Sequence, residues 1–308
     1  MNHLYFTEFR ALGCQVTVQL ETEADGMALL GQLPAQVEAL EAQLSRFRPE
    51  SELMQVNQQA GAWVATSEIL FNNLQAAKQA ARITDGWFNP LVLPAMLANG
   101  YDRSFEQLAP SPAAENIPAA DWHSLELRLP TREIRIPAGS ALDLGGIAKG
   151  WTAARLADTL AAYGPCLVNI GGDMVARGTP TAADGWPVSI NDPYSDTPLA
   201  SLALTDTAIV TSGVDFRRWK TQDGHTHHHI IDPRTGAPVQ TDVLTVTVVH
   251  PQATTAEAYA KAVILLGAEA GLHWLNHQWH AAGVVVRHDG AVLSTSRFVL
   301  LLNERMPS

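Results

Sequence analysis

The sequence predicts an α+β fold in which mixed sheets are flanked by helices. Three observations lead to this prediction. Apolar residues recur at intervals of three and four early in the chain, apolar and polar residues alternate in short runs after about residue 124, and short helical stretches separate these runs. No clean linker divides the chain, so a single domain is expected over residues 1–308, with a helix- and loop-rich part over about 1–122 and a sheet-rich part over about 123–308.

The elements of the first part follow from periodicity and capping residues. An alternating run predicts a strand over about 13–20, and a helical stretch follows over about 24–47, with Pro34 as a point where it can break. Ser-Glu-Leu at 51–53 indicates another helix start. The next helix is expected to begin at Thr66 or Ser67 and to end at Gly86. Residues 87–118 are rich in proline and are expected to form loops.

The second part reads as strands separated by short helices. Residues 124–130 and 133–137 predict a hairpin, and residues 150–164 predict a helix. CLVNIGGDMVARG (166–178) is expected to form one strand with a glycine break. Further strands are expected over 186–192, 199–213 and 243–251, then a helix over 254–278. Asp289-Gly290 is expected to be the turn of a final strand–turn–strand unit over 281–298.

Composition excludes several classes of function. The formal net charge is −11 and no Lys/Arg run is present, so a nucleic-acid partner is not expected. No stretch is long and apolar enough to span a membrane. The opening residues lack the pattern of a secretory signal, and Cys14 and Cys166 lie far apart, so a cytoplasmic location is expected. An acidic chain can still bind a phosphate ligand locally, through backbone amides, a few cations or a metal.

Glycine-containing turns mark the candidate binding site. They occur as DLGGIAKG (143–150), NIGGD (169–173), TSG (211–213) and HIIDPRTG (229–236). In the first, Gly145 and Gly146 allow close approach of the backbone to a ligand, and the following helix offers unpaired N–H groups to an anion. Lys149 adds a point charge. The spacing matches neither the dinucleotide-binding fingerprint nor the P-loop.

The order and intervals of these four motifs resemble those of the FAD:protein FMN transferase family, known as ApbE. LSRFRPESELMQVN (44–57), GWFNPLV (86–92) and RALGC (10–14) extend the resemblance over nearly the whole chain. It implies an ApbE-like, T-fold-related architecture with an FAD cleft between two lobes. The implied activity is transfer of FMN from FAD to a Ser/Thr hydroxyl of a target protein, with release of AMP. The alternatives are an FAD-binding protein without transferase activity, or a hydrolase that converts FAD to FMN and AMP.

The resemblance also implies site residues. His229, Lys261 and Asp232 are the implied catalytic residues, and His229 is expected to be the general base for the acceptor hydroxyl. Mg²⁺ in the family is held by an Asp, a Thr and a backbone carbonyl, which places the carbonyl of Ala148 and the carboxylate of Glu257 at the metal position. The implied FAD-binding residues are Asp143, Gly145, Gly146, Ala148, Lys149, Gly172, Asp173, Ser212, Gly213, His229, Ile231, Arg234 and Thr235.

Four histidines at 225 and 227–229 invite two other interpretations. If residues 224–232 form a strand, His225, His227 and His229 share one face and His228 faces the other way. Such a face can hold zinc, but nothing else in the sequence requires this metal. A cloning tag is not expected either, because the run is internal and its neighbours continue a family motif.

The sequence departs from the family at the metal-binding helix. The family pattern is Asp-Ala-Xaa-Xaa-Thr, whereas Glu257 and Lys261 stand at the Asp and Thr positions. Three interpretations follow. The two residues form an exposed i,i+4 pair without further role, or Glu257 still binds Mg²⁺ while Lys261 swings away. In the third, which we favour, the Lys261 ammonium replaces the metal and contacts the flavin pyrophosphate.

Overall fold

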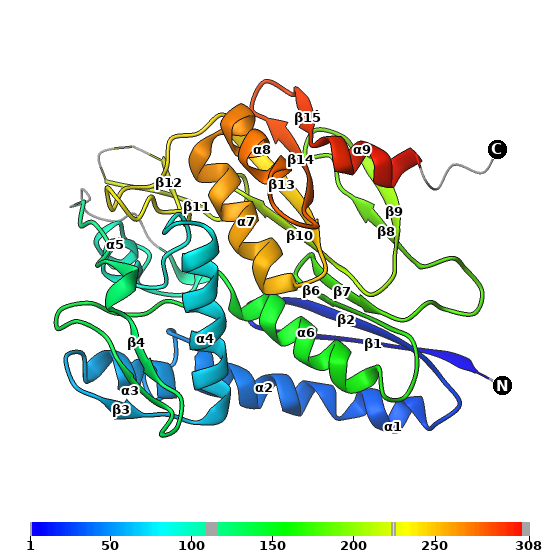
Figure 1. The fold of residues 1–308 in the computed structure, drawn as a ribbon, viewed down its shortest axis with the longest axis horizontal. Helices are drawn as coiled ribbons and strands as arrows, with labels where there is room; N and C mark the ends of the chain where they lie inside the picture. Colours follow the sequence, from blue (N-terminus) through cyan, green and yellow to red (C-terminus); the bar gives the residue numbers. More distant parts are fainter. Residues whose placement is uncertain (1, 109–115, 223, 225, 304–308) are drawn as a thin grey trace. The chain divides into compact units, whose positions relative to one another are not determined.

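The computed structural model describes residues 2–108, 116–222, 224 and 226–303. The chain divides into two compact units, each assembled from separate segments. The sheet unit comprises residues 1–38, 149–213 and 241–308, and the helical unit comprises residues 39–148 and 214–240. The mixture of helices and sheets confirms the predicted α+β class (Figure 1). The assignment of residues 1–308 to one domain stays a prediction.

The sheet unit is built on an eight-stranded sheet in which every neighbouring pair is antiparallel. In spatial order its strands are β1 (His3–Ala11), β2 (Cys14–Thr22), β6 (Cys166–Ile170), β7 (Asp173–Arg177), β10 (Ala208–Gly213), β13 (Val243–His250), β14 (Ala282–Arg287) and β15 (Val292–Ser294). A separate hairpin consists of β8 (Trp186–Ile190) and β9 (Ala200–Leu204).

Each face of this sheet has its own apolar core. Alternate residues of β2, namely Val16, Val18 and Leu20, are fully buried and pack against the helices of one face. The helices of this face include α1 (Gly26–Gly31), α6 (Ala148–Leu160) and α7 (Ala253–Leu266), and α8 (Ala268–Asn276) packs on α7 (Figure 1). The other face packs against the β8–β9 hairpin and α9 (Ser296–Asn303).

The helical unit combines short helices with small sheets. Its helices are α3 (Glu52–Gln58), α4 (Glu68–Ile83) and α5 (Leu93–Ala98), with the 3-10 helices η1 (Phe105–Gln107) and η2 (Trp122–Ser124). One small sheet has the strand order β3 (Val64–Ala65), β5 (Glu133–Arg135), β4 (Glu126–Arg128). A second sheet pairs β11 (Arg218–Lys220) with β12 (Thr226–His228). The remaining helix, α2 (Leu33–Leu44), contains the boundary between the units.

Several local predictions are confirmed. Ser51 and Ser67 cap α3 and α4, each accepting a hydrogen bond from a main-chain N–H three residues later. The predicted break near Pro34 is present, because α1 ends at Gly31 and α2 begins at Leu33. The hairpin over 124–137 and the strand–turn–strand unit around Asp289-Gly290 are also present.

Other predictions were wrong in ways that the backbone explains. Residues 166–178 form two antiparallel strands rather than one strand with a break. Residues 199–213 likewise form β9 and β10, separated by a turn in which Asp206 has a φ of 47°. The helix predicted over 254–278 is divided into α7 and α8 at Gly267, whose φ of 85° is incompatible with a helix. The first strand, β1, was not predicted at all.

Among the described residues, no helix combines the length and the apolar character that crossing a bilayer requires.

Candidate functional site

The NIGGD motif forms the tight turn between β6 and β7. Ile170 pairs with Asp173, and the two intervening glycines have positive φ angles, 61° at Gly171 and 95° at Gly172, as a two-residue hairpin turn requires. Gly171 also lies against Cys14, because a Cβ added to Gly171 would lie 2.9 Å from both the Cβ and the Sγ of Cys14. The RALGC and NIGGD motifs are therefore in contact within the sheet unit.

The two glycines of this turn offer a matched pair of substitutions. Gly171→Ala and Gly172→Ala both place a side chain at positive φ, which costs about 1–2 kcal/mol. Only Gly171→Ala also produces a steric clash, since no atom lies within 4 Å of a Cβ added to Gly172. We expect Gly171→Ala to lower the free energy of unfolding by about 1–3 kcal/mol more than Gly172→Ala, measured by urea denaturation. Equal effects would contradict the contact with Cys14.

Lys149, from the DLGGIAKG motif, lies between two buried carboxylates. Its Nζ forms an ion pair with Asp173 and lies 4.0 Å from Oε1 of Glu257. The side chains of Asp173 and Glu257 are each 1% exposed, whereas that of Lys149 is 21% exposed. Lys149 is therefore the more accessible member of this cluster, and the two carboxylates are shielded from solvent.

Glu257 also fixes the start of helix α6. Its Oε2 accepts a hydrogen bond of 3.0 Å from the main-chain N–H of Gly150, and a Cβ added to Gly150 would lie 2.6 Å from the same oxygen. Gly150 is thus required for the close approach. On α7, Lys261 donates a hydrogen bond of 3.3 Å to the main-chain oxygen of Glu257. The interpretation of Glu257 and Lys261 as an exposed helix pair is wrong, because the Glu257 side chain is buried against Lys149 and Gly150.

The position of Glu257 predicts a pH dependence of stability. Burial, reinforced by the neighbouring Asp173 carboxylate, raises the pKa of Glu257 to about 7, although Lys261, Lys149 and the Gly150 N–H oppose the rise. The folded protein therefore retains a proton that the unfolded chain loses above its ordinary pKa, so stability falls as the pH rises through this window. From about pH 5 to pH 7 we expect this group to lower the free energy of unfolding by roughly 2 kcal/mol.

Glu257→Gln provides the measurement for this prediction. The amide keeps the shape of the side chain and an acceptor for Gly150 but does not titrate in this range. Urea denaturation at about pH 5 and pH 7 should show the fall in the wild type and a much smaller one in the variant. An unchanged difference in the variant would assign the pH dependence to other groups.

These residues do not fit a divalent cation as they stand. A hydroxyl ligand in the family pattern is replaced here by the ammonium of Lys261, and a second ammonium, that of Lys149, already faces Oε1 of Glu257. Oε2 of the same carboxylate accepts from Gly150. A metal site of another kind, with three or more His, Cys, Asp or Glu ligands, is absent from the described part of the chain. The metal-ligand roles of Glu257 and the Ala148 carbonyl stay predictions.

In the helical unit, the DLGG segment is organised around Asp143. One carboxylate oxygen, Oδ1, accepts a hydrogen bond of 2.9 Å from the N–H of Gly145, and the other, Oδ2, lies 2.8 Å from Nε of Arg46. Arg46 also donates to the main-chain oxygen of Tyr101 and lies over the Tyr101 and Phe47 rings. Asp143 therefore stabilises the glycine loop, and both of its carboxylate oxygens have partners within the protein.

The DPRTG segment forms a second, self-contained turn. Asp232 accepts hydrogen bonds from the main-chain N–H and the guanidinium of Arg234, and its main-chain oxygen accepts from Thr235 and Gly236. Burial alone would raise the pKa of Asp232, but the hydrogen bonds and charge of Arg234 outweigh it and hold the pKa below its usual value. The exposed Arg234 guanidinium lies 3.9 Å from the centre of the Trp87 ring. Arg234 is thus held in place from two sides.

The histidine run is only partly a strand. Strand β12 covers Thr226–His228, and His229 follows it in a bend. The alternation of side chains between the two faces of a strand therefore ends before His229, so the strand does not place His227 and His229 on one face. His228 is within hydrogen-bond distance of the main-chain oxygen of Val239, which gives it a structural role. His225 lies outside the described residues. His229 is half-buried, and in the sequence it lies between β12 and the DPRTG turn.

The structure thus groups the predicted site residues into two sets. Lys149, Asp173, Glu257 and Lys261 come together in the sheet unit, and Gly172 belongs to the same turn as Asp173. Ser212 and Gly213 end β10 in this unit, paired with β13 rather than with the cluster. The helical unit holds Asp143, Gly145 and Gly146 in one loop, with Ala148 at the first position of α6, and His229, Ile231, Asp232, Arg234 and Thr235 in another loop.

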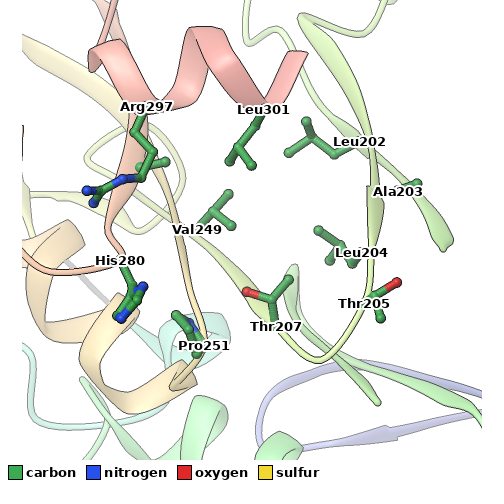
Figure 2. Close-up of a pocket in the computed structure, with 11 residues that line it drawn as sticks. Leu202, Ala203, Leu204, Thr205, Thr207, Val249, Pro251, His280, Arg297 and Leu301 are labelled. Carbon is green, nitrogen blue, oxygen red and sulfur yellow. The ribbon is translucent and has the colours of Figure 1, made fainter. Parts of the chain in front are cut away.

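The sheet unit contains a cavity of about 250 Å³ (Figure 2). Its walls come from β9, β13 and α9 of the sheet unit and are mainly apolar, with Leu202, Leu204 and Leu301 among the lining residues. The Arg297 guanidinium at its edge donates hydrogen bonds to the main-chain oxygens of Gln278 and Ala281, which gives this side chain a structural role. The cavity contains none of the predicted site residues.

Three contributors to the site were not predicted as site residues. Arg46 holds Asp143, Gly150 receives Glu257, and Cys14 packs on Gly171. Each lies inside a segment that carries the family resemblance, and this position in the sequence was the one feature that could have marked it as a site residue. Their roles were not evident, because each acts on a residue distant in sequence.

Comparisons with known proteins identify the family. The ApbE family profile matches residues 12–285. The chain is 35% identical over 280 residues to an FAD:protein FMN transferase of Treponema pallidum (strain Nichols), covering 83% of this chain and 76% of that protein. It is 27% identical over 304 residues to an FAD:protein FMN transferase of Klebsiella pneumoniae (strain 342), covering 96% and 93%.

Solved structures show the same fold. The crystal structure of the ApbE protein of Thermotoga maritima superposes with a TM-score of 0.85 at 24% identity, covering 97% of this chain and 99% of that one. The apo form of the flavinyl transferase ApbE of Pseudomonas stutzeri gives a TM-score of 0.83 at 23% identity, covering 98% and 97%. Fold, motif order and sequence identity agree, and the chain belongs to the ApbE family.

Proposed function

We propose that the protein transfers the FMN half of FAD to a Ser/Thr hydroxyl of a target protein and releases AMP. The observation that carries the proposal is the convergence of distant motifs in the sheet unit, where Lys149, Gly171 and Asp173 lie together. An accessible cation beside a glycine turn suits the phosphates of a nucleotide. The names of the relatives at 35% and 27% identity supply the reaction.

The proposed reaction is a displacement at phosphorus. The acceptor hydroxyl oxygen attacks the phosphorus of the FMN half, the bond from this phosphorus to the bridging oxygen breaks, and AMP leaves with that oxygen. His229 accepts the proton of the hydroxyl as general base. Asp232 and Arg234 hold the turn that follows His229 in a fixed shape.

The remaining residues are assigned to binding. Gly145, Gly146 and Lys149 are placed beside the phosphates, where close backbone approach and positive charge are needed. Asp173 acts through Lys149, which it holds by an ion pair. Gly172, Ser212, Gly213, Ile231 and Thr235 are assigned to flavin or ribose contacts. The cytoplasmic location and the Ser/Thr acceptor motif stay predictions.

The test is incubation of the protein with FAD and a peptide that carries a Ser/Thr acceptor motif, with nucleotides separated by HPLC and the peptide examined by mass spectrometry. The proposal expects AMP and a peptide whose mass increases by that of FMN less one water. AMP and free FMN without labelled peptide would indicate the hydrolase. Intact FAD bound to the protein would indicate a binding protein.

The role of His229 has its own measurement. We expect His229→Ala to lower the rate of peptide labelling by about 10²–10⁴-fold, because a general base contributes on this scale. FAD binding should weaken far less than the rate falls, since the proton transfer is a property of the transfer step and the other implied FAD contacts are kept. His288→Ala, at an exposed position of the sheet unit, serves as the matched control. Equal rates for the two variants would remove the assignment.

A further inference from the structure

We infer that the ammonium groups of Lys149 and Lys261 together replace the divalent cation of the family's metal position, so that FAD binds to this protein without one. The inference rests on the proposed function, because it takes FAD as the ligand. It goes beyond the proposed function in two ways. Lys149 takes over part of the metal's role, and nucleotide binding does not require a metal ion.

The arrangement of charges in the cluster supports this inference first. The carboxylates of Asp173 and Glu257 are almost completely buried, and Lys149 is the more accessible member of the cluster. A phosphate oxygen that approaches from solvent therefore meets an ammonium group. A dication bound at Oε1 of Glu257 would lie beside the Lys149 ammonium, which repels it.

The position of Lys261 supports it independently. Its Nζ lies 3.3 Å from the main-chain oxygen of Glu257, so the ammonium stays on the side of α7 where the family pattern has a Thr ligand. A second positive charge at that place repels a dication. It attracts the oxygens of a pyrophosphate, for which lysine is a good point-charge partner.

The formal charges are balanced in the same way as at a metal site. Two ammonium groups carry the same formal charge as one Mg²⁺, and each donates hydrogen bonds to phosphate oxygens. Asp173 then serves as the buried counter-charge that holds Lys149 in place, and Glu257 receives the N–H of Gly150, rather than acting as metal ligands.

The first experiment measures FAD affinity of the full chain by flavin fluorescence, once with EDTA and once with Mg²⁺. We expect dissociation constants that agree within about twofold. Lys261→Met should weaken FAD binding by about tenfold in both conditions, because a charge-assisted hydrogen bond to phosphate is lost. The control is Arg155→Met, which removes a positive charge at an exposed position of α6 and should leave the affinity within about twofold.

The second experiment restores the family pattern with the double variant Glu257→Asp/Lys261→Thr. We expect it to bind Mn²⁺, seen by electron paramagnetic resonance, and to bind FAD at least about tenfold more tightly with Mg²⁺ than with EDTA. The wild type should show no specific Mn²⁺ binding. Thermal unfolding verifies that the variant is folded, and if it is not, the first experiment decides alone.

The outcomes separate this inference from the proposed function. FAD binding by the wild type only in the presence of Mg²⁺, or unchanged affinity in Lys261→Met, would overturn the inference and leave the proposed function standing. Absence of FAD binding under both conditions would overturn both. Equal affinity in EDTA and Mg²⁺, combined with the loss in Lys261→Met, supports the inference.

Discussion

Replacement of Lys149 by Met is expected to lower the free energy of unfolding by about 3–5 kcal/mol at neutral pH, as removal of one partner of a buried ion pair does. The Met side chain fills a similar volume, so the loss arises from charge rather than from a cavity. Without the ammonium, Asp173 is left buried beside Glu257, and no other ion pair of Asp173 is present among the described residues. Urea denaturation at constant ionic strength measures the effect.

Two controls define what this result means. Arg155→Met removes an exposed charge from the same helix and should change stability by less than about 0.5 kcal/mol. The double variant Lys149→Met/Asp173→Leu removes both charges and should recover much of the loss, since an apolar replacement of a whole buried pair is often close to neutral. A loss below about 1 kcal/mol for Lys149→Met would show that the pair is solvated rather than buried.

The elements that were predicted correctly depend on local chemistry. The caps at Ser51 and Ser67 and the turn at Asp289-Gly290 are recognisable because the residue types and the backbone geometry they favour lie within a few positions of one another. The four glycine motifs were recognisable for a similar reason. Each is a short run of residue types that can be recognised in the sequence alone.

Strand β1 was missed because its two faces do not differ in polarity. Leu4 and Phe6 are 62% and 54% exposed, whereas the opposite face of the same edge strand presents Tyr5 and Phe9 to the core. Apolar residues on both faces remove the alternation that reveals a half-buried strand. No local sequence pattern indicates that Leu4 and Phe6 lie on the exposed face of the edge strand.

The environment of Glu257 depends on a distant contact. Spacing on a helix places Glu257 and Lys261 on one side, as predicted. Almost the whole of α7 is buried by packing, and the partner of Glu257, the N–H of Gly150, is 107 positions away in sequence. The same limitation applies to Arg46 and Asp143, where the ion pair is visible only once the loop and the end of α2 are folded together.

Arg46→Met is expected to lower the free energy of unfolding by about 3–5 kcal/mol, again because a buried carboxylate loses its cation. The side chains of Arg46 and Asp143 are 5% and 7% exposed, and their Nε and Oδ2 atoms lie 2.8 Å apart. The variant also loses the hydrogen bond to the Tyr101 carbonyl and the contacts of the guanidinium with two aromatic rings. Urea denaturation measures the loss.

Arg46→Lys distinguishes the charge of Arg46 from its shape. The ammonium keeps the charge beside Asp143 but cannot donate from a planar fork to Asp143 and Tyr101 together, so we expect an intermediate loss of about 1–3 kcal/mol. Because Asp143 also holds the N–H of Gly145, both variants should weaken FAD binding in the order of their instability. Equal losses of stability for Met and Lys would mean that the fork geometry, and not the charge, holds the glycine loop.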